Sequence, residues 1–253
     1  MWVASMPRTG SMWTTNVIKE IFKAANYITH PKNAIKSDMD SLKFFETSII
    51  RDLNKLNKYV LKIHVKLATL PYRSKIVTNI RSPYDICASH YEFMKCDLEL
   101  SISVAAESLN YLNHYKRLDN NIFLIRYENI EKTPKLLIKQ LAEYFEVSIN
   151  DQQVNQIDNK FNKDTISKLI KKNDNEMKIK KDQDVDQEKI IKLKNGHQRF
   201  FDITTGFQSG HISKRKTGEW KKNFSEKETK IIIEKLDQIA VDLGYISENS
   251  KNL

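Results

Sequence analysis

Four short apolar runs lie in the first half of the chain, separated by longer segments of mixed polarity. The runs are MWVASM at residues 1–6, YVLKIHV at 59–65, KIVTNI at 75–80 and IFLIRY at 122–127. Apolar and β-branched runs of this length are typical of strands. We therefore expect four strands in this part of the chain.

The segments between these runs have helical periodicity. Trp13, Val17 and Ile21 recur at the spacing of one helix face. Similar patterns return at residues 84–95, 102–117 and 134–145. Strands that alternate with helices predict an α/β fold, here a single domain with a central parallel sheet flanked by helices. In such a fold, ligands bind at the carboxyl ends of the strands.

The second half of the chain follows a different pattern. Residues 146 to about 215 are polar and rich in Asn and Lys, and they interrupt the alternation. We interpret them as a lid or insertion within a domain of residues 1–253. A final helix is well marked, because Ser225 and Glu228 form a capping box and Gly244 provides a stop.

Charge and cysteine content narrow the classes of protein. The formal net charge of +10 favours anionic partners, which include nucleic acids, membrane surfaces and polyanionic small molecules. Cys87 and Cys96 are expected on opposite faces of one helix, which supports neither a disulfide nor a metal site. No apolar run approaches a membrane span, and the apolar start is too short for a signal peptide. We therefore expect a cytoplasmic protein that does not bind membranes.

The stretch SMPRTGSM at residues 5–12 joins the first strand to the first helix. A strand, a glycine turn and a helix N-terminus together form an anion site, because free backbone N–H groups converge there. A nucleotide kinase with a P-loop needs two glycines and a Lys-Ser or Lys-Thr pair. Only Gly10 is present, which disfavours that class.

Two further positions are candidates for chemistry. Arg81 ends a strand, and Ser82 and Pro83 are an N-cap and a first helical residue, which predicts a second anion site or only a capped helix. His64 follows Lys62 by two residues, so both lie on one face of the expected strand. A single histidine in an apolar strand is more often structural than catalytic.

Five stretches together resemble the sulfotransferases that use 3′-phosphoadenosine-5′-phosphosulfate (PAPS) and release PAP. PRTGSMW resembles the family loop P-K/R-S-G-T-T-W, and the other four follow in family order up to residue 225. They are LKIHVKL, RSPYDICASHYEF, LIRYENIEKTPK and RKTGEWKKNFS. The resemblance implies a sulfotransferase domain with a loop like a P-loop for the phosphosulfate group.

The resemblance also implies roles for particular residues. The 5′-phosphosulfate would lie against Arg8, Thr9, Gly10, Ser11 and Met12. Trp13 and Tyr127 would contact the adenine, and Arg81 with Ser89 would bind the 3′-phosphate. Further phosphate contacts are implied for Lys214, Arg215, Lys216 and Gly218. The family spacing puts an arginine at Ser213 and a glycine at Arg215, so the basic residue that contacts the phosphate stays open.

By the same resemblance, His64 is the base that takes a proton from the acceptor, while Lys62 and Arg8 stabilise the transferring group without a metal. The acceptor is a hydroxyl or amine of a small molecule. The chain is also similar to bacterial enzymes that modify natural products, including guanidinium alkaloid toxins. Its acceptor pocket is expected from residues 27–50, 90–100 and the insertion. The alternatives are a nucleotide or small-molecule kinase and a basic nucleic-acid-binding protein; neither explains the ordered motifs, and no motif predicts the oligomeric state.

Overall fold

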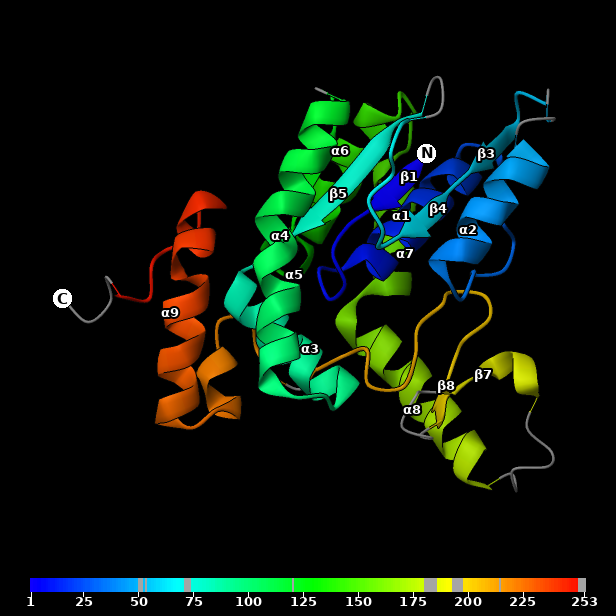
Figure 1. Cartoon of the computed structure of the whole chain (residues 1–253). Helices are drawn as coiled ribbons and strands as arrows, with labels where there is room; N and C mark the ends of the chain where they lie inside the picture. The colour runs from blue at the N-terminus through cyan, green and yellow to red at the C-terminus, as the bar shows by residue number, and fades with distance from the viewer. Residues whose placement is uncertain are drawn as a thin grey trace. The chain divides into compact units, whose positions relative to one another are not determined.

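The computed structural model describes residues 1–49, 52, 54–70, 74–119, 121–179, 186–192, 198–213 and 215–249. The chain forms two compact units whose segments alternate along the sequence. Unit 1 comprises Met1–Val3, Met12–Ile63 and Glu131–Ile212, and unit 2 comprises Ala4–Ser11, His64–Ile130 and Ser213–Leu253. Figure 1 shows the path of the chain, coloured from blue to red. No helix among the described residues is both long enough and apolar enough to cross a membrane.

The first part of unit 1 is built from short strands and two helices. Its elements are β1 (Trp2–Ala4), α1 (Ser11–Ala24), β2 (Ile28–His30), α2 (Asp38–Phe44), a π-helical turn (Phe45–Ile49), β3 (Asn57–Tyr59) and β4 (Leu61–Ile63). β2 and β3 are parallel, with Ile28 opposite Asn57. The Ser41 hydroxyl on α2 donates to the Lys62 carbonyl at 3.1 Å. This bond ties α2 to β4, and the two lie side by side in Figure 1.

The second part of unit 1 contains the segment interpreted above as an insertion. This part of unit 1 begins with α6 (Pro134–Tyr144). The elements that follow are α7 (Asp151–Phe161), α8 (Lys163–Ile179), a 3-10 turn (Gln187–Lys189), and the antiparallel pair β7 (Ile190–Lys192) and β8 (Gln198–Phe200). Asn150 and Gln153 form a capping box at the start of α7. Val154, Ile157 and Phe161 are buried on one face of that helix. The polar composition therefore concealed two amphipathic helices.

Unit 2 contains the longer strands and a layer of helices. Its elements are β5 (Ile76–Ile80), α3 (Pro83–Met94), α4 (Leu98–Leu118), β6 (Phe123–Arg126), α5 (Tyr127–Lys132, which runs into unit 1), a 3-10 turn (Trp220–Asn223) and α9 (Glu226–Asp242). β5 and β6 are parallel, with Val77 opposite Phe123. The strand order of the main sheet is β4-β1-β5-β6. Helices α3, α4 and α9 share an apolar core that includes Tyr84, Ile86 and Trp220.

Most predicted elements are confirmed, including the capping box at Ser225 and the end of α9 before Gly244, whose φ is 77°. Two predictions are wrong. Cys96 does not share a helix with Cys87, because Lys95 ends α3 in the left-handed conformation with φ 51°. The run at 59–65 is not one strand, because β3 ends at Tyr59 and β4 ends at Ile63.

Candidate functional site

The loop between β1 and α1 belongs to unit 2 up to Ser11 and has the tight turn that an anion site needs. Arg8 and Gly10 are left-handed, with φ 68° and 92°. A Cβ on Gly10 would lie 2.6 Å from Ile130 Cδ1 and 3.1 Å from Tyr127 Cδ2, so only glycine fits. The Thr9 hydroxyl donates to the Met6 carbonyl at 2.7 Å and fixes the turn. The loop delivers the chain to the N-terminus of α1 at Ser11.

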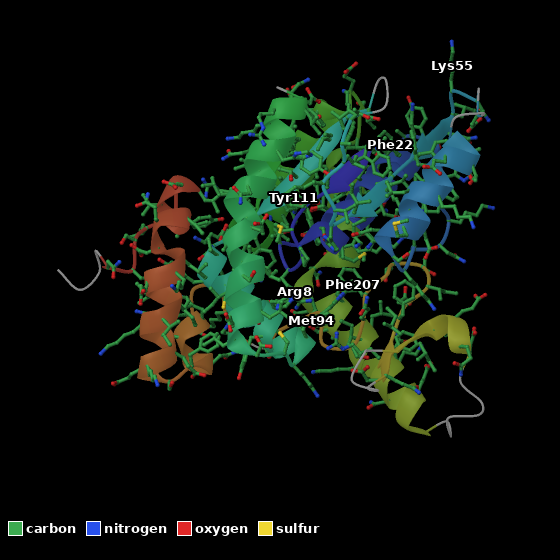
Figure 2. The ribbon with its side chains drawn as sticks, viewed as in Figure 1. Arg8, Phe22, Lys55, Met94, Tyr111 and Phe207 are labelled. Atoms are coloured by element: carbon green, nitrogen blue, oxygen red, sulfur yellow. The ribbon has the colours of Figure 1, made fainter. Side chains whose placement is uncertain are left out.

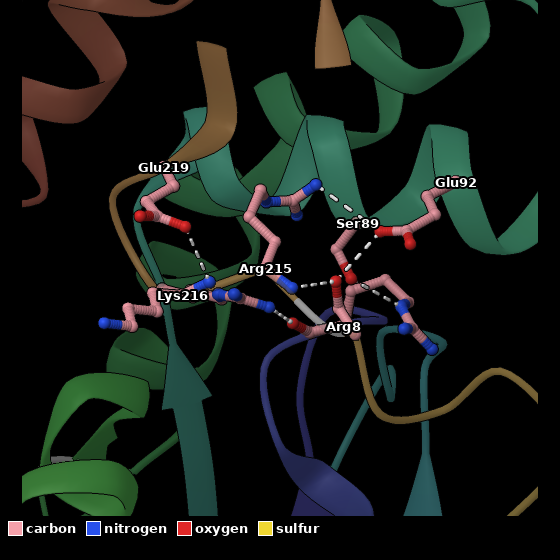
Figure 3. Close-up of polar contacts among 8 residues, drawn as sticks. Arg8, Ser89, Glu92, Arg215, Lys216 and Glu219 are labelled. Atoms are coloured by element: carbon pink, nitrogen blue, oxygen red, sulfur yellow. Dashed lines mark hydrogen bonds and ion pairs between the residues drawn. The ribbon is translucent and has the colours of Figure 1, made fainter. Parts of the chain in front are cut away.

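Arg8 and two residues from the second predicted anion site are in direct contact. Arg8 Nε donates to Ser89 Oγ at 3.0 Å, and Arg81 Nη1 donates to the Arg8 carbonyl at 3.1 Å. The Arg8 guanidinium also lies 4.0 Å from the ring centre of Phe93. Sequence analysis assigned Arg8 and Ser89 to opposite ends of a nucleotide, whereas here they are hydrogen-bonded (Figure 3).

Arg81 is buried at the end of β5, with 7% of its surface exposed. Its guanidinium carbon lies 3.9 Å from the ring centre of Tyr127, the residue expected at the adenine. Arg81 Nε is buried and has no hydrogen-bond partner among the described residues. A buried guanidinium N–H without an acceptor is rare in folded proteins.

Arg215 is the second buried guanidinium in this part of unit 2. Its side chain is 6% exposed, and its Nη1 lies 3.4 Å from Glu92 Oε2 (Figure 3). Its Nε and Nη2 are buried and find no acceptor within the described parts of the chain. Burial lowers the pKa of Arg215, and the negative charges of Glu92 and Asp85 oppose that shift while the positive charge of Arg81 adds to it.

The other basic residues of the C-terminal motif differ from Arg215. Lys216 is exposed, and its backbone N–H donates to Glu219 Oε2 at 3.2 Å (Figure 3). Lys214 lies outside the described residues. Among the candidates that are described, only Arg215 has a buried charge with unused donors.

Asp85 and Trp220 hold the loop that carries Arg215. Asp85 is 1% exposed, and its Oδ2 accepts the Gly218 N–H at 2.9 Å. Gly218 is left-handed with φ 86°, which explains glycine at this position. Trp220 stacks on Tyr84, with ring centres 5.0 Å apart and planes at 12°. Sequence analysis missed the roles of Asp85 and Glu92, although Asp85 stands in the stretch RSPYDICASHYEF.

His64 lies one residue past the end of β4, at the start of a segment of unit 2. His64 Nδ1 is 2.7 Å from the Ser5 carbonyl, which only accepts, so Nδ1 carries the proton and Nε2 is the basic nitrogen of the neutral ring. The Ser5 hydroxyl in turn accepts the Asn79 N–H at 2.9 Å. Ser5 and Asn79 are supporting residues that sequence analysis missed.

The segment after His64 is held against α4, which explains why β4 does not continue. Tyr111 and Tyr115 on α4 donate their hydroxyls to the Val65 carbonyl, at 2.8 and 3.0 Å. Tyr111 is labelled on α4 in Figure 2. The Leu67 N–H donates to the Tyr115 hydroxyl at 3.1 Å. These bonds replace strand pairing and fix the chain next to His64.

Three of the predicted site residues, Met12, Trp13 and Lys62, belong to unit 1. Met12 and Lys62 line a pocket in that unit. Burial lowers the pKa of Lys62, and the negative charge of Asp38 opposes the shift. Trp13 is 7% exposed and sits in the first turn of α1. Within the described ranges, no group of three or more His, Cys, Asp or Glu side chains is arranged to hold a metal ion.

Comparisons with known proteins agree with the motifs. A family model described as "Sulfotransferase domain" matches residues 1–241. Sulfotransferase 1B1 from Canis lupus familiaris is 21% identical over an alignment of 182 residues, and the match covers 61% of this chain and 62% of that protein. The match thus spans less than two thirds of that relative.

Two solved structures are similar in fold. The first is a mouse sulfotransferase, SULT7A1, complexed with PAP, with a TM-score of 0.62, 16% identity, and coverage of 94% of this chain and 82% of that chain. The second is retinol dehydratase in complex with androsterone and the inactive cofactor PAP, with a TM-score of 0.61, 17% identity, and coverage of 94% and 79%. These similarities identify an α/β fold with a central parallel sheet flanked by helices.

Proposed function

The chain belongs to the sulfotransferase domain family, and from that membership we propose that it transfers a sulfuryl group from PAPS to a hydroxyl or amine of a small molecule. The observation that carries the proposal is the pair of buried arginines in unit 2. Arg81 Nε, Arg215 Nε and Arg215 Nη2 are buried without acceptors among the described residues. An anion with several oxygens, such as a phosphate, satisfies donors of this kind.

In this proposal, the two ends of the nucleotide are bound by different parts of unit 2. Arg81, Arg215 and Ser89 bind the 3′-phosphate. Of the three basic residues Lys214, Arg215 and Lys216, we thus assign Arg215 to this contact. The loop from Arg8 to Ser11, with the N-terminus of α1, binds the phosphosulfate end. Tyr127 contacts the adenine, and Trp13 and Met12 complete the nucleotide site.

Arg8 changes partner in the proposed complex. In the described structure its guanidinium donates to the neutral hydroxyl of Ser89 at 3.0 Å. A phosphate or sulfuryl oxygen is a stronger acceptor, because charge-assisted hydrogen bonds are about twice as strong as neutral ones. Arg8 then offsets negative charge during transfer, and it remains protonated, so it does not donate a proton to the leaving group.

The proposed mechanism assigns proton transfer to His64. Bound PAPS supplies the sulfuryl group and a phosphate leaving group. His64 Nε2 takes the proton of the acceptor as the acceptor attacks, and the Ser5 carbonyl, 2.7 Å from Nδ1, holds the ring and stabilises the imidazolium. The Lys62 ammonium and the Arg8 guanidinium stabilise the charge that develops in the transition state.

A denaturation experiment tests the proposal. We expect PAP at about one hundred times its dissociation constant to add roughly 2.7 kcal/mol to the free energy of unfolding. The measurement is made in EDTA, because the proposal needs no metal. Adenosine 5′-monophosphate, which lacks the 3′-phosphate, serves as the matched control and should stabilise less. Stabilisation by ATP with Mg²⁺ and none by PAP would indicate a kinase, and salt-dependent binding of random DNA without PAP binding would indicate a nucleic-acid-binding protein.

The acceptor and the location belong to the same proposal. We place the enzyme in the cytoplasm, which is consistent with the free thiols of Cys87 and Cys96. A natural product with a hydroxyl or amine is the acceptor that the sequence resemblance favours. An acceptor screen with PAPS, with sulfated products detected by mass, identifies it.

A further inference from the structure

Helix α1 has polar side chains on a face that is buried. Met12, Thr15, Asn16 and Lys19 follow the spacing i, i+3, i+4 and i+7, which places them on one face. Thr15, Asn16 and Lys19 are only 7%, 5% and 6% exposed. Other faces of α1 bury the apolar side chains of the core, among them Ile18. Buried polar side chains need partners: Asn16 donates to the Met12 and Thr205 carbonyls, and Lys19 donates to the Pro31 carbonyl.

This face lines the pocket of unit 1, together with residues from three other segments. Pro31 and Ile35 come from the segment between β2 and α2, and Lys62 comes from β4. Thr205 comes from the segment interpreted above as an insertion, and its carbonyl accepts from Asn16 Nδ2 at 2.7 Å. The described residues that line the pocket include two lysines and no acidic residue. The pocket is small and positively charged, and it therefore favours a single negatively charged group at one end of a ligand.

Lys19 is the residue that a negative charge would pair with. Its Nζ donates to the Pro31 carbonyl at 2.8 Å, and this is the one hydrogen bond found for the ammonium among the described residues. An ammonium has three donors. The neighbouring Glu20 is bound to Lys23 and Lys160 instead, at 2.7 and 2.8 Å. Lys19 is thus a buried charge without an ion-pair partner in the described structure.

Burial has the expected effect on this charge. It lowers the pKa of Lys19 to about 8; the charge of Lys23 also lowers it, and the charge of Glu20 opposes the shift. A buried cation without a counter-ion is unfavourable, and a bound anion removes that penalty. A singly charged carboxylate matches one ammonium, which leaves Lys62 for the proposed transfer reaction.

We propose that the acceptor carries a carboxylate that binds Lys19 in this pocket, in addition to the hydroxyl or amine that is sulfated. This inference rests on the proposed sulfotransferase function and narrows its substrate class to hydroxy- and amino-carboxylic acids. Pro31, Ile35 and the Met12 side chain provide the apolar walls. Asn16 holds Thr205 at the pocket and so positions one wall.

Matched acceptor pairs test the inference. Each pair contains a carboxylate and its neutral amide, such as 4-hydroxyphenylacetate with 4-hydroxyphenylacetamide, and N-acetyltyrosine with N-acetyltyrosinamide. Sulfation is measured with PAPS by mass, and binding of each compound is measured by calorimetry in the presence of PAP. We expect the carboxylates to be favoured about tenfold or more in kcat/KM and in affinity, as for a charge-assisted hydrogen bond.

The variant Lys19→Met should reduce this preference to about twofold or less, because it keeps an unbranched side chain but removes the charge. Lys23→Met is the matched control: Lys23 lies one turn further along α1, its side chain is 51% exposed, and it pairs with Glu20. That variant should keep the full preference. PAP-induced stabilisation should be the same in wild type and in both variants.

A second variant covers the case in which Lys19→Met fails to fold. Thr15→Asp places a carboxylate one turn before Lys19 in the same pocket, and it should abolish the preference by pairing with the ammonium. The inference would be overturned if the wild type preferred the amides. It would also be overturned if the carboxylate preference survived in both pocket variants. If PAP stabilises the wild type but no carboxylate binds or reacts, the substrate class is wrong and the proposed function stands. If PAP does not stabilise the wild type, the proposed function itself fails.

Discussion

The proposed phosphate cluster of unit 2 and the pocket of unit 1 contain different cations. The cluster uses arginines, Arg81 and Arg215, whose guanidinium groups present several donors to an anion. The pocket uses lysines, Lys19 and Lys62, whose pKa values burial lowers. A lysine responds to its surroundings, so the charge in the pocket depends on the ligand and on pH.

The two regions also differ in how their cations are held. The loop of Arg215 is fixed by a backbone contact to Asp85 at 2.9 Å and by the stacking of Trp220 on Tyr84. Lys19 instead stands in the middle of α1 and is held by one carbonyl. We infer that unit 2 is preorganised for one ligand, whereas the pocket of unit 1 sets acceptor preference through a single charge.

The largest expected effect is the loss of the proposed base. His64→Asn should reduce single-turnover sulfation of a hydroxyl acceptor by about 10² to 10⁴, the range for a positioned general base. The fold and PAP-induced stabilisation should remain, because asparagine can still donate to the Ser5 carbonyl. The rate is measured at saturating PAPS. A rate close to that of wild type with a hydroxyl acceptor would make His64 structural, and such a rate with an amine acceptor alone would indicate N-sulfation in which the base is dispensable.

The second-largest expected effect is on PAP affinity, which should depend on Arg215 but not on Lys216. Arg215→Ala should weaken PAP binding by about 1.5–3 kcal/mol, or roughly 10- to 150-fold, because it removes charge-assisted hydrogen bonds. Lys216→Ala is the matched control, and it should change affinity only slightly because Lys216 is exposed and its charge is screened. Calorimetry with PAP and with adenosine 5′-monophosphate measures both variants. An equal loss for the two nucleotides would show that Arg215 does not contact the 3′-phosphate.

The residues of the proposed phosphate cluster are easier to find in the sequence than those of the pocket, for a physical reason. Loops at helix N-termini need particular residues, and these leave a pattern: Gly10 is required by its φ of 92° and by the close approach of Tyr127, and Pro83 marks the start of α3. The residues that hold such a site in place are harder to recognise in the sequence. The contacts of Asp85 and Ser5 join residues far apart in the chain, and no local spacing reveals them.

The amino-acid composition did not indicate the pocket or the helices in the second part of unit 1. Lys19 in a helix is usually taken for an exposed residue, and only its tertiary surroundings show that it is 6% exposed. In the same way, α7 and α8 bury narrow apolar stripes within segments whose residues are mostly polar. Local pattern therefore predicts elements that depend on turns and caps, and it misses features that depend on which distant segment covers a face.

The third expected effect uses pH to compare the two regions. Lys19 in the ligand-free protein has a pKa of about 8, so above that pH an increasing fraction is neutral and cannot pair with a carboxylate. The KM for a carboxylate acceptor should therefore rise by up to about tenfold per pH unit above 8, as one proton is linked to binding. PAP affinity should stay flat over this range, because the proposed phosphate contacts are made by guanidinium groups and not by a lysine. Lys62 also faces the pocket, so the comparison with Lys19→Met isolates the contribution of Lys19.

The smallest expected effect is on the free energy of unfolding. Replacing Lys19 should raise it, whereas replacing a lysine that stabilises the fold would lower it. The pKa of Lys19 falls from 10.5 to about 8 on folding, so the charged form is disfavoured in the folded state below pH 8. Lys19→Met removes that penalty but also loses the bond to Pro31, and we expect a net gain of roughly 1–2 kcal/mol at pH 7. Between pH 8 and 10.5 the unfolded wild type binds more protons than the folded one, so wild-type stability rises and the gain of the variant shrinks. Urea denaturation at pH 7 and pH 9.5 measures both values. A variant that is less stable than wild type at pH 7 would mean that the bond to Pro31 holds the fold together, and the pocket would then lack the unpaired charge that distinguishes it from the phosphate cluster.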